Sequence, residues 1–362
     1  MPSYKKFLHI GMALDPIHVG TGGARIGRVD LTIVRDPITR VPKIPGSSLA
    51  GVYRTYVAMA ETEAKSDRKI DNKNWPYYPH CAGLGLARNS YLGHCGQPDC
   101  PVCTVFGFAR GKDQTGGFAG LAAFSDAHVL LFPVSTYRGP YWITCPMALQ
   151  FLGLELSNIR DNTAYLIEKS NQSSDHLIEK SNQSSQLNFG WLFLPTKTFD
   201  DERQENQNVQ KKLKELSIPD SIKGRIAILP DHLFIHVVNS NLEVRTSVSI
   251  NPETGTAEEK ALFSYEALPR TTVLVWEIIA KNPRHFKING KDVDVTLNQD
   301  RKMVSPDEVL EITKKAHPYL EHLGIGGMGT RGMGRVKVLH SKDADSDQKT
   351  YQETKQIEGI EE

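Results

Sequence analysis

Cysteine spacing is the sharpest chemical signal in the sequence. Four of the five cysteines lie within 23 residues, and they are Cys81, Cys95, Cys100 and Cys103. Cysteine pairs separated by two to four residues can place both sulfurs on one tetrahedral zinc ion, and four thiolates leave no open position for catalysis. We therefore predict a structural Zn²⁺ site held by these four cysteines.

Two alternatives to this ligand set remain open. His80 and His94 each adjoin a cysteine, so either could replace one thiolate. The cysteines could also be free buried thiols. The segment around them is rich in glycine and proline and has little apolar core of its own, which favours a metal.

A second segment, Gly324–Arg335, is rich in glycine and arginine. Six of the eleven positions from Gly324 to Gly334 are glycine. It contains the pattern GxGxxG, but a dinucleotide site needs a βαβ unit, and only one short strand and a polar tail follow. Successive backbone N–H groups can cradle phosphate, and arginines attract RNA phosphates. We predict RNA contacts by Gly326, Gly327, Arg331 and Arg335. The alternative is a tight loop packed on the sheet.

The start of a helix after Pro45 offers another anion site. Ser47 or Ser48 is a good N-cap residue, and the free N–H groups at a helix N-terminus favour anions. Arg54 lies farther along the same helix. We predict that Ser47, Ser48 and Arg54 contact RNA phosphate.

One carboxylate, Asp30, follows a Gly-rich loop. An exposed loop acid can hold Mg²⁺ together with water and RNA oxygens. Spacing alone does not establish this role, because an isolated aspartate in a loop is most often a turn or cap residue.

Apolar periodicity indicates the elements that position these residues. Alternating or β-branched runs predict strands at Phe7–Leu14, Leu31–Val34, Leu121–Phe132, Ile226–Val238 and Arg335–Leu339. Helical spacing and capping residues predict helices from Ser47 or Ser48 to about Glu63, over Asp200–Glu215 and from Ser305 onward. The polar turn Asn251–Gly255 predicts a hairpin within Val244–Val275.

This order of elements favours an α+β fold with helices on one face of an antiparallel sheet, and a ferredoxin-like or RRM-like core fits best. We expect one domain over residues 1–340, with a metal-organised insertion at about 66–120 and a disordered acidic tail at 341–362. The run LIEKSNQSS occurs at 166–174 and again at 177–185, and we interpret it as a tolerated loop or surface-helix expansion.

Composition narrows the functional classes. A formal net charge of +1 over 362 residues counts against a free-standing nucleic-acid-binding domain. A subunit that shares one RNA with neighbouring copies needs only a basic stripe. The sequence has no run of about 18 apolar residues and no signal-peptide pattern. We therefore expect no membrane partner and a cytoplasmic location.

Several stretches together resemble the RAMP-superfamily backbone subunits of type III CRISPR effector complexes, and they are most similar to the type III-B subunit. Near the N-terminus they are PIHVGTG at 16–22, GRVDLTIVRDP at 27–37 and PKIPGSSL at 42–49. Farther on they are CTVFG at 103–107, FSDA at 124–127, LLFPV at 130–134, TGTA at 254–257, ALF at 261–263, YE at 265–266, LP at 268–269 and the glycine segment at 324–335.

The resemblance implies an RRM-like core that stacks with further copies of itself along a CRISPR guide RNA, beside other type III subunits. It implies a hairpin, the thumb, at about Arg245–Tyr265 that pushes between bases, and RNA contacts by His18 and Arg245. It also implies that Asp30 cuts the paired target RNA. In that reaction the RNA 2′-hydroxyl attacks the adjacent phosphate, and Mg²⁺ or Mn²⁺ stabilises the charge.

One departure from the family pattern concerns guide binding. The family usually carries Ser-Leu-Lys-Gly at the helix start, whereas here Leu49 is followed by Ala50 and Gly51. The lysine contact with phosphate is missing at that position. Guide binding is therefore expected to depend on Lys43, Arg54 and the glycine segment.

Two other functions are weighed against the cutting subunit. A guide-holding scaffold would use the same filament surface without cutting, and Asp30 would be a turn residue. An enzyme that trims CRISPR repeats would need a general base, for which His18 is available. The hairpin and the context of Asp30 favour the filament subunit.

Overall fold

The computed structural model describes residues 2–22, 29–82, 94–109, 116–156, 159, 162–167, 186–199, 204–258, 262–297 and 301–343. Nearly all of the LIEKSNQSS repeat and residues 344–362 lie outside the described residues, so what we predict for them stays a prediction. None of the helices described is both long and apolar enough to cross a membrane.

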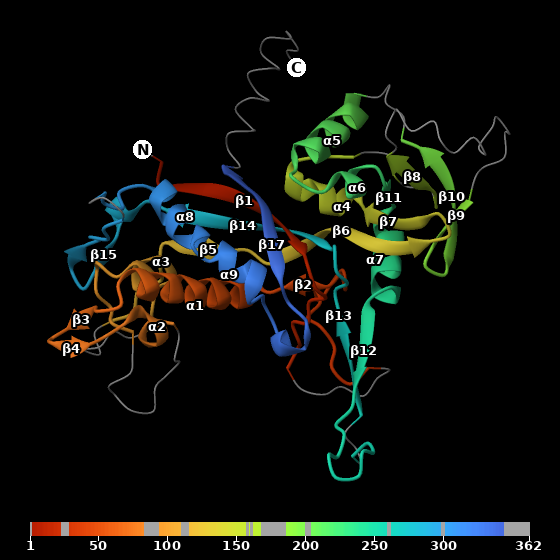
Figure 1. The fold of residues 1–362 in the computed structure, drawn as a ribbon. Coiled ribbons are helices and arrows are strands. Elements are labelled where there is room, and N and C mark those ends of the chain that lie inside the picture. The colour runs from red at the N-terminus through yellow and green to blue at the C-terminus, as the bar shows by residue number, and fades with distance from the viewer. Residues whose placement is uncertain are drawn as a thin grey trace, which may run out of the picture.

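Four antiparallel strands form the centre of the sheet. They are β1 (Tyr4–Ala13), β6 (Ala127–Thr136), β14 (Val273–Lys281) and β17 (Val336–Asp343). Their spatial order is β17–β1–β14–β6 (Figure 1). Helix α1 (Gly46–Ala64) lies between β1 and β6 in sequence, and α8 (Pro306–Lys314) and α9 (His317–His322) lie between β14 and β17. This split βαβ connectivity is the one expected for a ferredoxin-like core.

Strand β14 is apolar on both faces, so both faces of the sheet need a cover. Leu274 and Trp276 contact the core that includes α1, α8 and α9, whereas Val273 and Val275 face a second core. The second core contains residues of α4 (Pro146–Leu149), α5 (Gln204–Glu215) and α6 (Asp220–Lys223). The prediction of helices on one face only was therefore wrong.

Beyond β6 the sheet becomes mixed. The order continues through β7 (Gly139–Thr144), β11 (Ile226–Ile228), β8 (Ala164–Ile167), β10 (Leu192–Thr198) and β9 (Gln186–Phe189). Strand β11 runs parallel to β7, and β10 runs parallel to β8. The predicted antiparallel sheet thus holds for the central strands but not for this half.

The predicted strand Ile226–Val238 was wrong beyond its first three residues. Strand β11 ends at Ile228, and Pro230 is the N-cap of helix α7 (Asp231–Ser240). Phe234, Val237 and Val238 are buried at helical spacing. Their β-branched and aromatic composition favoured a strand, but a proline at the N-cap starts a helix instead.

The predicted hairpin is present. Strands β12 (Glu243–Ser247) and β13 (Phe263–Ala267) pair in antiparallel register, and the hairpin projects away from the body of the molecule (Figure 1). Its outer part exposes apolar side chains, including Val248, Ile250 and Leu262. These side chains contribute nothing to the core, so they are available to a partner.

The remaining elements are short. They are β2 (Lys43–Ile44), β3 (Lys69–Ile70), β4 (Lys73–Asn74), α2 (Tyr77–His80), α3 (Pro101–Phe106), β5 (Ala122–Phe124), η1 (Gln150–Leu152), η2 (Pro283–His285), β15 (Lys287–Ile288), β16 (Lys291–Asp292) and η4 (Gly329–Arg331). The predicted strand Leu31–Val34 forms isolated bridges rather than a regular strand. The prediction of disorder from residue 341 was wrong for Ser341–Asp343, which continue β17 and pair with Phe7–His9.

Candidate functional site

Asp30 is fixed to the base of the β12–β13 hairpin. Its Oδ2 accepts hydrogen bonds from the Ser264 backbone N–H at 2.7 Å and from the Ser264 hydroxyl at 2.9 Å. These bonds hold the pKa of the Asp30 carboxyl below its usual value. The side chain is exposed, so the structure places an ionised carboxylate on the surface beside the hairpin.

The segment that follows Asp30 runs along strand β13. Leu31 forms a parallel bridge with Tyr265. The Leu31 N–H donates to the Ser264 carbonyl at 3.1 Å, and the Glu266 N–H donates to the Leu31 carbonyl at 3.0 Å. The loop that carries Asp30 and the hairpin therefore form one hydrogen-bonded unit at this level.

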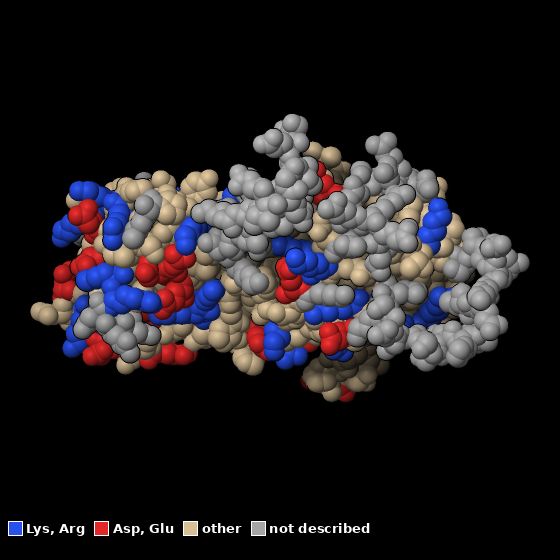
Figure 2. Space-filling view, turned by 90° about the horizontal axis from the view of Figure 1, so that it is seen from above, with Lys and Arg blue, Asp and Glu red and all other residues tan. Residues whose placement is uncertain are grey.

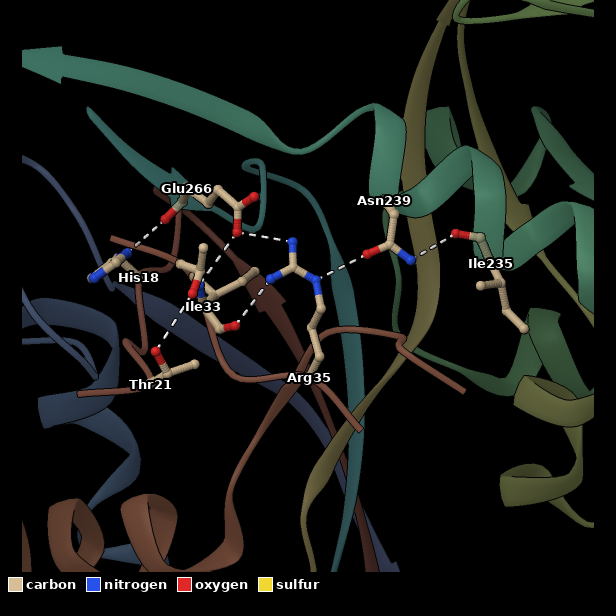
Figure 3. A network of polar contacts seen from close by, with 8 residues as sticks. His18, Thr21, Ile33, Arg35, Ile235, Asn239 and Glu266 are labelled. Atoms are coloured by element: carbon tan, nitrogen blue, oxygen red, sulfur yellow. Dashed lines mark hydrogen bonds and ion pairs between the residues drawn. The ribbon is translucent and has the colours of Figure 1, made fainter. Parts of the chain in front are cut away.

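An ion pair anchors the far end of this segment. Arg35 Nη2 lies 2.8 Å from Glu266 Oε2, and both side chains are largely buried. Arg35 Nε also donates to Asn239 Oδ1 of helix α7 at 3.0 Å (Figure 3). Arg35 thus joins the Asp30 loop, strand β13 of the hairpin and helix α7, which precedes the hairpin.

His18 lies under the hairpin and is buried. Its Nδ1 lies 2.6 Å from the Glu266 carbonyl oxygen, and its ring packs edge-on against Tyr265 with centroids 5.9 Å apart. The His18 ring is therefore not accessible to RNA, which argues against the predicted contact. The side chain instead supports the strand that carries Ser264 and Glu266.

The glycine segment packs against the His18 backbone. The Gly327 N–H donates to the His18 carbonyl at 2.8 Å. Gly326 has φ +91°, and a Cβ there would lie 2.3 Å from the same oxygen. Only glycine fits such an approach with a positive φ.

The predicted phosphate cradle in this segment is largely occupied. The N–H groups of Ile325, Gly327 and Gly334 donate to carbonyls of the chain itself. Arg331 remains exposed, with its guanidinium 5.9 Å from the Phe263 ring and Nη1 3.2 Å from the Ser247 hydroxyl. The alternative of a tightly packed loop is thus correct for the backbone of Ile325, Gly327 and Gly334. Arg331 instead lies beside Phe263 and Ser247 at the hairpin base.

Two other predicted RNA contacts already have acidic partners. Arg335 binds Asp15 through two hydrogen bonds, at 2.5 and 3.1 Å, which lower the pKa of the Asp15 carboxyl. Arg245 Nε lies 2.6 Å from Glu243 Oε1. Both arginines are partly or well exposed, so phosphate would have to compete with a carboxylate at each.

The predicted anion site at the start of α1 holds a carboxylate of the chain. Asp126 Oδ1 accepts the Gly46 N–H at 2.8 Å, and its Oδ2 lies 2.6 Å from Lys43 Nζ. The N-cap is Pro45 rather than Ser47 or Ser48, which lie inside the first turn. The serine-cap prediction was wrong because Asp126, distant in sequence, supplies the missing acceptor.

Arg54 points into the insertion rather than toward the hairpin. Its Nε donates to the Cys81 carbonyl at 3.0 Å, and its Nη2 donates to the Gly107 carbonyl. Burial lowers the pKa of its guanidinium. This placement argues against the predicted phosphate contact by Arg54.

The four clustered cysteines converge as predicted. All are buried and free, and their sulfurs lie within 4.8 Å of one another. Two of the sulfur separations are 3.6 Å, for Cys95 and Cys103, and 4.0 Å, for Cys81 and Cys100. A tetrahedral ion with bonds of about 2.3 Å would set its sulfurs about 3.8 Å apart. The donor set and its size therefore fit Zn²⁺.

Two arginines flank this cluster. Arg68 Nη2 lies 3.4 Å from Cys95 Sγ, and Arg54 holds the Cys81 carbonyl. Four thiolates around a divalent ion carry a net charge of −2, which neighbouring cations offset. His80 and His94, the alternative ligands, do not join the cluster of four among the residues described.

Charge is mixed on the face of the molecule seen in Figure 2. Lysine and arginine side chains lie among aspartate and glutamate side chains, and those described form no basic stripe on that face. This agrees with the formal net charge of +1.

Sequence reasoning missed the residues that position the site. No local pattern gave a role to Ser264. Arg35 and Glu266 belong to stretches that resemble the family, but the resemblance gave neither residue a role. The spacing of Ser264 and Glu266 on one strand was a usable signal, because alternate strand residues share a face. Their partners, Asp30 and Arg35, lie more than 200 positions away, which no local pattern reveals.

The RAMP superfamily model matches residues 12–337. The CRISPR system Cmr endoribonuclease Cmr4 of Pyrococcus furiosus is 29% identical over 331 residues, which cover 90% of this chain and 92% of that protein. The CRISPR system Cms endoribonuclease Csm3 of Methanothermobacter thermautotrophicus is 32% identical over 110 residues, or 30% of this chain and 32% of that protein.

Solved structures agree in fold. A chain of the type III-B Cmr-beta complex bound to cognate target RNA superimposes with a TM-score of 0.56 at 15% identity, covering 93% of this chain and 98% of that chain. A crystal structure of Cmr4 superimposes with a TM-score of 0.54 at 21% identity, covering 94% and 100%.

Proposed function

We propose, on the premise that this chain belongs to the RAMP superfamily, that it is a guide-RNA-binding backbone subunit of a type III CRISPR complex and cleaves complementary target RNA. Two of its relatives are endoribonucleases of CRISPR systems. The match to Cmr4 spans 90% of this chain and 92% of the relative. The proposal therefore concerns the whole chain rather than one shared segment.

The observation that carries the proposal is the position of Asp30. Its carboxylate is exposed and ionised at the base of a hairpin that projects from the body with apolar side chains along it. An apolar hairpin can separate stacked bases, at a cost of a few kcal/mol for each step. The nucleotide that it displaces would lie beside Asp30.

In the proposed reaction an RNA 2′-hydroxyl loses its proton and attacks the adjacent phosphate, and the bond from phosphorus to the 5′-oxygen of the next nucleotide breaks. The products are a 2′,3′-cyclic phosphate and a 5′-hydroxyl that takes up a proton. A base pushed out of the stack frees its sugar to reach the in-line geometry that this attack needs. Asp30 would hold Mg²⁺ or Mn²⁺, which supplies stabilisation of charge on the phosphate. In this reaction the protein would hold the Asp30 carboxylate in place and would hold the displaced nucleotide against it.

The RNA contacts that the geometry favours surround the hairpin base. Arg331 and Arg245 lie on this side. Gly326 and Gly327 are exposed there, although the Gly327 N–H is already donated to the His18 carbonyl. Lys43, Ser47 and Ser48 form a weaker case, because Asp126 already neutralises that helix start. Phosphate at these positions would have to displace a carboxylate of the chain.

A repeat-trimming enzyme with His18 as general base is the less favoured function. The His18 ring is buried and its Nδ1 is engaged by the Glu266 carbonyl. A general base must reach the proton that it abstracts. A guide-holding scaffold without cutting activity remains the second candidate, and the same hairpin supports it.

The cysteine cluster is proposed to hold one structural Zn²⁺. Cys81, Cys95, Cys100 and Cys103 would be its four ligands, and Arg54 and Arg68 would offset its charge. The ion would stabilise an insertion whose described elements are short. Further proposed partners are additional copies of this chain and the other subunits of a type III complex.

The test uses the complex assembled on a guide RNA of known sequence with an end-labelled complementary target. We expect regularly spaced cuts. A single 2′-deoxy nucleotide on the 5′ side of one scissile phosphate should abolish that cut and leave the others. Non-complementary RNA is the control and should stay intact. Tight target binding without any cut would identify a scaffold instead.

A further inference from the structure

Asp30 makes a reciprocal contact with one residue of the hairpin. Ser264 donates to Asp30 Oδ2 through its backbone N–H at 2.7 Å and its hydroxyl at 2.9 Å. The Asp30 N–H lies 3.3 Å from the Ser264 hydroxyl oxygen. Three hydrogen bonds thus fix both the backbone and the side chain of Asp30 relative to strand β13.

A nearby aspartate shows what an ordinary turn residue does. Asp36 Oδ1 accepts hydrogen bonds from the N–H groups of Ile38 and Thr39 and from the Thr39 hydroxyl. That carboxylate caps its own turn, the usual role of a loop aspartate. The donors on Asp30 lie 234 positions away. Among the described residues, the bonds that Asp30 Oδ2 accepts from another residue therefore come from the hairpin.

One carboxylate oxygen is left for chemistry. Both bonds from Ser264 go to Oδ2, and among the residues described none donates to Oδ1. A carboxylate held at one oxygen keeps a fixed direction while the other oxygen stays available. Positioning within a fraction of an ångström is what a reacting group requires.

The surrounding contacts make this position depend on the hairpin. Leu31 pairs with β13 on both sides of Tyr265, and the Arg35–Glu266 ion pair holds the segment farther along (Figure 3). Ser264 and Glu266 lie two residues apart, so their side chains share one face of the strand. A shift of the hairpin base would carry Asp30 with it.

We propose that Ser264 is the positioning residue of Asp30, and that it fixes the cutting carboxylate to the strand of the hairpin that displaces the target base. The inference rests on the proposed function and adds to it how the cut is aligned with the displaced nucleotide. Ser264 does not touch the reacting atoms and acts through Asp30.

The test compares Ser264→Ala with Ser264→Thr, which restores a hydroxyl, in complexes assembled on guide RNA. Ser240→Ala is the matched control, because among the described residues the Ser240 hydroxyl bonds within α7 and to its neighbour Asn241. Single-turnover cleavage and target affinity are measured separately. Ser264→Ala should slow cutting about tenfold to a hundredfold at unchanged target affinity, and Ser264→Thr should recover most of the rate.

A second measurement does not depend on cutting. Backbone hydrogen exchange in the peptide containing Leu31 should accelerate in Ser264→Ala and stay slow in Ser264→Thr and Ser240→Ala. Wild-type cutting and exchange in Ser264→Ala would overturn the proposal, as would equal losses in the alanine and threonine variants.

An Asp30→Ala complex run in parallel separates the two claims. If Asp30→Ala is inactive while Ser264→Ala cuts like the wild type, the function stands and the role of Ser264 fails. If Asp30→Ala cuts like the wild type, the cutting role of Asp30 fails, and the role of Ser264 fails with it.

Discussion

At the scale of single residues, carboxylates of the chain decide which cations are available to RNA. Lys43 faces Asp126, Arg335 faces Asp15 and Arg245 faces Glu243. The two arginines are partly exposed, and ion pairs of this kind contribute little stability, so phosphate can compete for them. The Lys43 side chain is mostly buried. Arg331 contacts only a hydroxyl and an aromatic ring among the described residues. It is therefore the cation most ready for phosphate at the hairpin base.

Asp126 gives a prediction about stability and pH. Burial raises the pKa of its carboxyl, but Lys43 and the Gly46 N–H outweigh burial and leave that pKa below its usual value. A lowered folded-state pKa means stabilisation that is present near neutral pH and lost as pH falls below about 4. Asp126→Asn should lower the free energy of unfolding by about 1 kcal/mol at pH 7, with a smaller effect at pH 3.

Chemical denaturation at both pH values checks this prediction. Asp292→Asn is the control, because Asp292 is highly exposed and pairs only at 3.5 Å with an exposed lysine. A loss of equal size at both pH values would show that the Asp126 charge is not the cause.

The cysteine cluster predicts a metal content that one substitution removes. Cys100→Ala deletes one of four buried thiol ligands, so the purified protein should lose its single zinc ion and melt at a lower temperature. Cys145→Ala is the matched control, since Cys145 is buried but lies outside the cluster. Elemental analysis measures the zinc. Zinc retained by Cys100→Ala, or absent from the wild type, would contradict the assignment.

At the scale of elements, the hairpin and the Asp30 segment form one functional unit. Strand β13 holds the segment through backbone pairing, Ser264 and Glu266. The outer hairpin adds exposed apolar side chains beyond that base. Base displacement and cutting would therefore belong to different parts of one element.

Shortening the hairpin separates these two parts. Replacing residues 248–262 with a two-residue turn removes Val248, Ile250 and Leu262 and leaves the Ser247–Phe263 pair and the Ser264 contact in place. We expect target cleavage to fall at least about tenfold, because the nucleotide would stay stacked and its 2′-hydroxyl would stay out of line. Guide-RNA retention should be unchanged. Cuts at the same positions and rate would show that the tip does not prepare the target.

Elements fixed by contacts between residues close in sequence could be predicted, whereas features fixed by residues distant in sequence could not. Local periodicity was enough for α1, α8, the hairpin and the central strands β1, β6 and β17, because Leu49, Tyr53 and Val57 already mark a helix face. It did not separate β14 from the predicted hairpin segment that ends at Val275. It failed for α7, where valines and phenylalanine resemble a strand. It also failed for Ser47 and Ser48, since the acceptor at that helix start comes from Asp126, 80 positions away.

At the scale of the whole molecule, one large mixed sheet links the core to the site. Both faces of β14 are covered by separate apolar clusters, and the hairpin leaves the chain immediately before this strand. A rigid central strand thus supports a projecting element. The cysteine cluster lies in the insertion, into which Arg54 of α1 points, and a metal there would act on folding and not on cutting.

The central claim is that Asp30 is the group through which this chain cuts target RNA. The most direct measurement maps cuts on a complementary target by guide-loaded complexes carrying wild-type chain, Asp30→Asn or Asp292→Asn. We predict regularly spaced cuts for wild type and Asp292→Asn, and none for Asp30→Asn, with equal target affinity in all three. Cuts by Asp30→Asn at the wild-type positions and rate would contradict the account.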